Sequence, residues 1–209
     1  MATINDKRGQ MLEEINAERG YGVFLLAQMD SVPDTLQFMV ATTEYDPEAD
    51  GLRDRSRYLV RAIGVQEHLI SVGIFKQAHI HEGEEHPLLY EYNSPPAGLF
   101  FRGQPESPDS LILNLFQAYS SVFGPWRQIP RYLSTSQPLY EMFTSGGALI
   151  GEMPLPLAEK LVPVLEAQNL ETRLVKGEKP KEQPPMKLLL LDESYAVAMD
   201  FAVDPLGQA

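Results

Sequence analysis

The sequence contains no cysteine, and this absence excludes several classes of chemistry at once. A chain without thiols cannot form disulfides, zinc–thiolate sites or iron–sulfur clusters, and it has no cysteine nucleophile. The chain also lacks an apolar run of about 18 residues, the length that a membrane-spanning helix needs. Its N-terminal segment has no apolar signal core. We therefore expect a soluble, cytoplasmic protein with no membrane partner.

Basic residues are scarce beside acidic ones. The chain has 17 Lys and Arg against 29 Asp and Glu, a net charge of −12. A surface of this sign repels phosphates, so we expect no nucleic-acid partner. With 44% hydrophobic and 22% charged residues, the composition is that of a globular protein. A single domain, 1–209, fits this length; the alternative is a body at 1–144 with a smaller α/β subdomain at 145–209.

Alternating apolar residues and turn residues predict an N-terminal antiparallel meander that follows a short helix at 5–19. No spacer between these strands is long enough for a crossover helix, which parallel pairing would need. The expected strands lie at 21–29, 36–43, 57–66, 69–81, 88–93 and 99–102.

Two main helices are predicted after the meander. The first, at 107–123, begins at the good N-cap Ser107 and ends at Gly124. The second, at 155–168, lies between expected strands, which is typical of a βαβ unit with a parallel pair. The chain then ends in a predicted hairpin. Together these elements predict an α+β fold, with a largely antiparallel sheet packed by the two helices. The strands of the C-terminal part lie at 148–153, 170–175, 187–191 and 195–203.

Histidine is also scarce, and all 4 histidines lie in the segment 67–92. In a strand, His79 and His81 share one face, while the opposite, aliphatic face is expected to face the core; it carries Ile70, Val72, Ile74, Ala78 and Ile80. Two histidines at this spacing can bind a transition metal if a further ligand folds back toward them. The alternative is that they are partly exposed residues at the end of a strand.

A short family resemblance points toward the metal. Gly73, His79, His81 and Glu85 resemble the first half of the first cupin motif, in which two histidines and a glutamate bind a divalent metal inside a small barrel. The resemblance covers about 13 of 209 residues, and no histidine follows His86 to supply the second cupin motif. It implies that His79, His81 and Glu85 are ligands. Without the resemblance, the third ligand of a His79–His81 site could be Glu82, Glu84, Glu85 or His86, folding back toward the strand.

Arginines recur at alternate positions just before the histidines, at Arg53, Arg55, Arg57 and Arg61. A three-residue turn between the strands at 57–66 and 69–81 keeps apolar residues on the core face, whereas a slip by one residue would bury the arginines. This register places Arg57 near Gln77, Arg61 near Gly73 and Arg55 near His79. Such a face suits a carboxylate or phosphate. The alternative is a solvated face whose arginines pair with the protein's own acids.

A third candidate is Trp126 and Arg127, in an irregular segment with Arg131 and Tyr132. These residue types are typical of interface hot spots, and equally of a plug that anchors a loop to the core. Because no catalytic constellation is complete, we expect a non-enzymatic binding or assembly module for an acidic protein partner or a small anionic ligand. No cofactor is expected for it. Its expected site residues are Arg55, Arg57, Arg61, Gln77, His79, Trp126 and Arg127.

The alternative function is a metal-dependent enzyme that acts on a small molecule. A divalent transition metal would then be bound by His79 and His81, with Glu85 or His86 as third ligand, and would activate a water molecule. The sequence does not define the oligomeric state.

Overall fold

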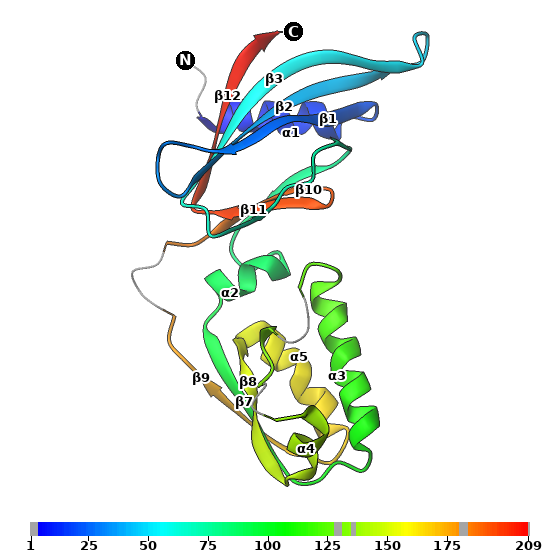
Figure 1. The fold of residues 1–209 in the computed structure, drawn as a ribbon, viewed down its shortest axis with the longest axis vertical. Helices are drawn as coiled ribbons and strands as arrows, with labels where there is room; N and C mark the ends of the chain where they lie inside the picture. The colour runs from blue at the N-terminus through cyan, green and yellow to red at the C-terminus, as the bar shows by residue number, and fades with distance from the viewer. Residues whose placement is uncertain (1–3, 128–130, 135–136, 180–183, 209) are drawn as a thin grey trace. The chain divides into compact units, whose positions relative to one another are not determined.

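The computed structural model describes residues 4–127, 131–134, 137–179 and 184–208. The chain forms two compact units (Figure 1). Unit 1 comprises Met1–Gly83 and Pro184–Ala209, and unit 2 comprises Glu84–Gln183. Both contain helices and antiparallel strand pairs, so the predicted α+β class is confirmed. The expected boundary at 144/145 does not coincide with this division, because strands from either side of it pair within unit 2.

Unit 1 contains the helix α1 (Ile4–Asn16) and two antiparallel sheets. The first sheet has the order β12 (Asp200–Gln208), β3 (Gly51–Ile63), β2 (Thr35–Asp46), β1 (Gly20–Met29) and β5 (Ile74–Phe75). The second has the order β4 (Glu67–Leu69), β11 (Ser194–Ala198), β10 (Lys187–Leu191) and β6 (Ala78–His81). The core lies between the two sheets and α1, and includes Ile15, Phe38, Val60, Leu189 and Phe201.

The first pair of strands in the predicted meander and the predicted C-terminal hairpin are both confirmed in unit 1. β1 pairs with β2, and β10 pairs with β11. The last predicted strand differs, because it divides near Met199 into β11 and β12, which belong to different sheets. Since β12 pairs with β3, the C-terminus completes the sheet that the N-terminal strands begin.

The single strand predicted at 69–81 is wrong, because the chain forms β5 in one sheet and β6 in the other. The Asp192 carboxylate accepts hydrogen bonds from the backbone N–H groups of Lys76 (2.8 Å) and Gln77 (3.1 Å), and the chain changes sheets there. Phe75 is consequently buried, whereas Ile74 is 62% exposed.

The strand predicted at 88–93 is also wrong, because these residues belong to the short helices η1 (Pro87–Leu89) and α2 (Tyr90–Asn93). His86 explains the difference. Its Nδ1 accepts a hydrogen bond from the Leu88 N–H at 3.3 Å, and Pro87 then occupies the first helical position. A cap followed by proline favours a helical start over a strand.

Unit 2 contains a three-stranded sheet in the order β8 (Gly147–Pro154), β7 (Pro96–Arg102) and β9 (Glu171–Lys176). Its helices also include α3 (Pro108–Phe123), α4 (Leu139–Thr144) and α5 (Leu155–Glu166). Both predicted main helices are confirmed, and the Ser107 hydroxyl caps α3 by accepting from the Ser110 N–H at 3.4 Å. None of the helices in the described ranges is long and apolar enough to cross a membrane.

The predicted βαβ unit is correct in its order of elements but wrong in its pairing. β8 and β9 are each antiparallel to β7, so they run parallel to each other with β7 between them. One face of this sheet, with Leu99 and Phe101, packs on α3 and α5. Figure 1 shows both helices on the same side of the sheet. Within the described part of unit 2, the opposite face is left open.

Candidate functional site

The arginines of β3 do not meet the histidines of β6 through strand pairing, so the predicted register is wrong. β3 pairs with β2 on one edge and with β12 on the other, and no edge remains for the histidine strand. Arg57 lies opposite Ala41, and His79 lies opposite Leu190. Gln77 is exposed next to the turn at Asp192. The predicted single Arg/His face is therefore two separate surfaces of unit 1.

The arginines of β3 lie beside carboxylates of unit 1, as in the alternative interpretation of this strand. A β-bulge also divides them, because Thr42 lies opposite Ser56 and Thr43 opposite Asp54, which leaves Arg55 without a cross-strand partner. This places Arg53 and Arg57 on opposite faces of the sheet. The ion pairs are Arg61–Asp204 (2.6 Å), Arg57–Asp54 (3.2 Å) and Arg55–Glu44 (4.0 Å).

One of these pairs predicts a pH dependence of stability. The hydrogen bond from Arg61 holds the pKa of Asp204 below its ordinary value of 3.8. Because the pKa is lower in the folded state, the pair stabilises the fold above about pH 4, and this contribution is lost as the pH falls through the folded-state pKa. We expect the free energy of unfolding to decrease less between about pH 7 and about pH 3 in Asp204→Asn than in the wild type. Urea unfolding followed by circular dichroism measures this, and equal decreases would contradict it.

The histidines do not form a metal site with the predicted partners. His79 and His81 lie on β6 with their ring centroids 6.1 Å apart, and Ala78 beside them is buried, as predicted. Glu85 and His86 belong to unit 2, where the His86 ring lies edge-on to Trp126 at 6.3 Å. Among the described residues, no three His, Asp or Glu side chains are grouped so as to hold a metal ion. The ligand set implied by the cupin resemblance is therefore not assembled.

The segment around Trp126 is anchored to α2 through Glu91. The Arg127 side chain is only 4% exposed and lies 3.7 Å from the Glu91 carboxylate, and Arg131 lies 2.8 Å from the same group. The Tyr132 hydroxyl donates to Glu91 at 2.9 Å. Burial and the Glu91 charge raise the pKa of Tyr132, so its hydroxyl stays protonated as the donor. This arrangement resembles the predicted plug.

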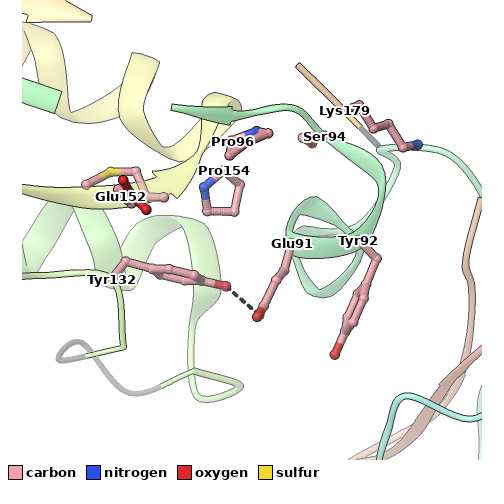
Figure 2. A pocket seen from close by; sticks show the side chains of 9 residues that line it. Glu91, Tyr92, Ser94, Pro96, Tyr132, Glu152, Pro154 and Lys179 are labelled. Carbon is pink, nitrogen blue, oxygen red and sulfur yellow. Dashed lines mark hydrogen bonds between the residues drawn. The ribbon is translucent and has the colours of Figure 1, made fainter. Parts of the chain in front are cut away.

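Next to this network lies a cavity of about 280 Å³ (Figure 2). Its walls include Tyr132, Met153 and Ser94. The Ser94 hydroxyl oxygen is buried and has no hydrogen-bond partner in the described part of the chain. A buried hydroxyl without a partner costs about 1–3 kcal/mol, which a ligand atom could recover after rotation of the serine side chain.

This cavity lies at one end of the open face of the β8-β7-β9 sheet. Cross-strand register arranges its residues in rows. Phe100 on the central strand β7 is 37% exposed, and Val175 on the edge strand β9 is 45% exposed, so the two form a small exposed apolar patch on this face. From the α2 end, the rows are Glu152–Gly98–Val175, Leu149–Phe100–Arg173 and Gly147–Arg102–Glu171.

Three adjoining hollows form a groove along this face, which we call the β7 groove. The cavity near Tyr132 shares Pro96 and Glu152 with a second hollow of about 260 Å³. The second shares Phe100 and Val175 with a third of about 500 Å³, which Arg102 and Arg173 also line. The groove therefore follows β7, and from Gly98 to Arg102 a strand extends about 13 Å.

Four charged side chains on the open face of the β7 groove have no partner within the described structure, in contrast to Glu91 at its end. The side chains of Arg102, Arg173, Glu152 and Glu171 have no ion pair or hydrogen bond to another described residue. They contrast with the arginines of β3, which lie beside the protein's own acids. Positive charge is thus available at Arg102 and Arg173, and negative charge at Glu152 at the other end of the groove and at Glu171 beside Arg102.

Sequence reasoning missed these residues, although part of the signal was present. Alternation in the strand predicted at 170–175 already placed Arg173 and Val175 on one face. The position of β7 between β8 and β9 could not be inferred, and this position gathers the face. Comparison of the chain with protein-family models, with curated proteins and with solved structures found no match.

Proposed function

We propose that this protein is a non-enzymatic binding module, and that its β7 groove holds an extended acidic segment of a partner protein. The observation that carries the proposal is the pair Arg102 and Arg173, whose guanidinium groups have no ion pair among the described residues and flank the exposed ring of Phe100. A guanidinium group binds carboxylate through two parallel hydrogen bonds, which makes arginine suited to acidic partners.

The apolar part of the groove supports the same function. Phe100 and Val175 lose water when a partner covers them, and an aromatic residue beside arginine is typical of the energetic centre of an interface. In an extended segment, alternate side chains point to the same side. Such a segment can therefore place an apolar side chain on Phe100 and, two residues further on, a carboxylate on Arg102 in the next row.

The chemistry of the groove favours binding over catalysis. The Tyr132 hydroxyl is a donor to Glu91, and its raised pKa makes it a poor nucleophile or base. No histidine is among the residues that line the three hollows. What these residues offer is hydrogen bonding, ion pairing and apolar contact.

The proposal predicts that Arg102→Glu/Arg173→Glu abolishes capture of a fluorescent peptide of alternating glutamate and leucine. Each partly exposed ion pair contributes about 1 kcal/mol, so the loss of two corresponds to about thirtyfold in Kd, and the introduced glutamates add repulsion. Fluorescence anisotropy measures the affinity, and circular dichroism checks that the variant is folded.

The matched control is Arg57→Glu/Arg61→Glu, which makes the same change of charge on β3 in unit 1. We expect this variant to keep most of the affinity. If it loses binding while the Arg102/Arg173 variant keeps it, the acidic partner binds the surface predicted from the sequence. No binding by the wild type would refute the function.

A further inference from the structure

We infer that the segment held in the β7 groove is dipolar, with a basic residue four positions from its acidic residue and an apolar residue midway. This inference rests on the proposed function and specifies its partner. The feature that carries it is Glu152, a carboxylate without an ion pair among the described residues, at the end of the groove away from Arg102.

The spacing follows from the register of the open face. Glu152 lies in the row of Gly98, Phe100 marks the middle row, and Arg102 lies in the last row. Neighbouring rows are two residues apart along β7, and side chains on one side of an extended segment repeat at the same interval. A segment that lies along β7 thus brings positions i, i+2 and i+4 over Glu152, Phe100 and Arg102. Either chain direction satisfies this order.

The cavity beside Glu152 suits the side chain of lysine. Pro96, Met153 and Pro154 provide apolar walls for its methylene stem, and Glu152 accepts from its ammonium group. Figure 2 shows Lys179 on the far side of the cavity from Glu152, with its ammonium group directed away from that carboxylate. Its positive charge still opposes a bound lysine, so its removal should strengthen binding.

The net charge of the chain favours a dipolar segment over a purely acidic one. With a net charge of −12, the protein repels an acidic segment before the arginines of the groove can engage it. A basic residue in the segment reduces this repulsion and adds an ion pair with Glu152. Within the groove, Glu152 and Glu171 balance Arg102 and Arg173, so a segment that carries one charge of each sign is the better complement.

Two capped peptides of sequence KSLSE and QSLSE, which differ only in the basic residue, test the inference. We expect wild-type protein to bind KSLSE about fivefold more tightly, the effect of one partly exposed ion pair. Isothermal titration or NMR titration measures both affinities. A third peptide, SKLSE, keeps leucine and glutamate two positions apart but moves lysine to the other side of the extended segment, so it should lose the gain.

Variants assign the gain to Glu152. Glu152→Gln should make KSLSE and QSLSE bind equally. Glu171→Gln, the matched control on the same face, should keep the difference in affinity between the two peptides. Lys179→Gln should increase that difference. Equal binding of KSLSE and QSLSE by the wild type, with loss of both in Arg102→Glu/Arg173→Glu, overturns the dipolar segment but leaves the binding function standing. Failure of the wild type to bind either peptide overturns both.

Discussion

Glu91→Ala is expected to destabilise unit 2 by about 3 kcal/mol, because it removes the carboxylate that Arg127, Arg131 and Tyr132 share. Arg127 is the reason for the size of the effect. Its side chain is 4% exposed, and a buried guanidinium group that loses the Glu91 carboxylate cannot replace it with water without opening the structure. The exposed part of Glu91 moderates the loss, since its own side chain is 33% exposed.

Urea unfolding followed by the fluorescence of Trp126 measures this prediction, because the only tryptophan lies next to Arg127 in unit 2. The control is Glu159→Ala, which removes an exposed ion pair with Lys176 at 3.3 Å. We expect that control to change the free energy of unfolding by less than about 0.5 kcal/mol. Equal small effects of the two substitutions on the free energy of unfolding would show that the Glu91 network does not stabilise the segment around Trp126.

Glu91 also connects the fold to the candidate site. It lines the cavity at the end of the β7 groove, and its bond with Tyr132 fixes one wall of that cavity (Figure 2). We therefore expect Glu91→Gln, which keeps the shape of the side chain, to preserve more peptide affinity than Glu91→Ala. The network positions the groove, and the charges that bind the partner lie elsewhere.

Elements with strong local signals could be predicted from the sequence. The helix α3 has a serine cap, a proline in its first turn and a glycine at its end. The first hairpin has β-branched and aromatic strands around a turn with proline and aspartate. Each signal lies within the element itself, so no knowledge of distant residues is needed.

Elements that depend on distant residues could not be predicted. The break between β5 and β6 is made by Asp192, more than a hundred positions along the chain from Lys76. The acid that neutralises Arg61 is Asp204, from the strand β12 that the sequence did not separate from β11. Because Arg55, Arg57 and Arg61 lie beside acids of unit 1, the arginine face predicted from the sequence is largely paired with the protein's own carboxylates.

The proposed partner is still acidic, as expected from the sequence, but the proposed binding surface moves from the arginines of β3 to the β7 groove. Arginine beside an aromatic residue remains the chemistry that suits an acidic segment. On β3 the fold places acids next to the arginines, whereas on β7 and β9 it places Arg102 and Arg173 beside Phe100 with no ion pair in the described ranges. The proposed binding site is therefore placed at Arg102 and Arg173, which have no ion pair in the described ranges, rather than at the more numerous arginines of β3.

Gly151→Ala is expected to destabilise unit 2 by about 3 kcal/mol, because an added Cβ would meet backbone atoms that cannot swing aside. A Cβ at this position would lie 1.9 Å from the carbonyl oxygen of Tyr132 and 3.0 Å from its carbonyl carbon. Either β8 or the segment that carries Tyr132 must move, and that segment is hydrogen bonded to β8 where the Ser134 N–H donates to the Ile150 carbonyl at 2.7 Å.

Gly98→Ala on the neighbouring strand is the matched control for Gly151→Ala. Its Cβ would meet the ring of Phe100 at 3.3 Å, and a side chain can turn where a backbone cannot. We expect a loss of less than about 1 kcal/mol in stability. Because Gly98 forms the floor of the β7 groove, its methyl group should nevertheless weaken binding of KSLSE. Thermal unfolding and peptide titration of both variants distinguish the two roles. A Gly98→Ala protein that binds with full affinity would contradict the placement of the partner segment on the open face.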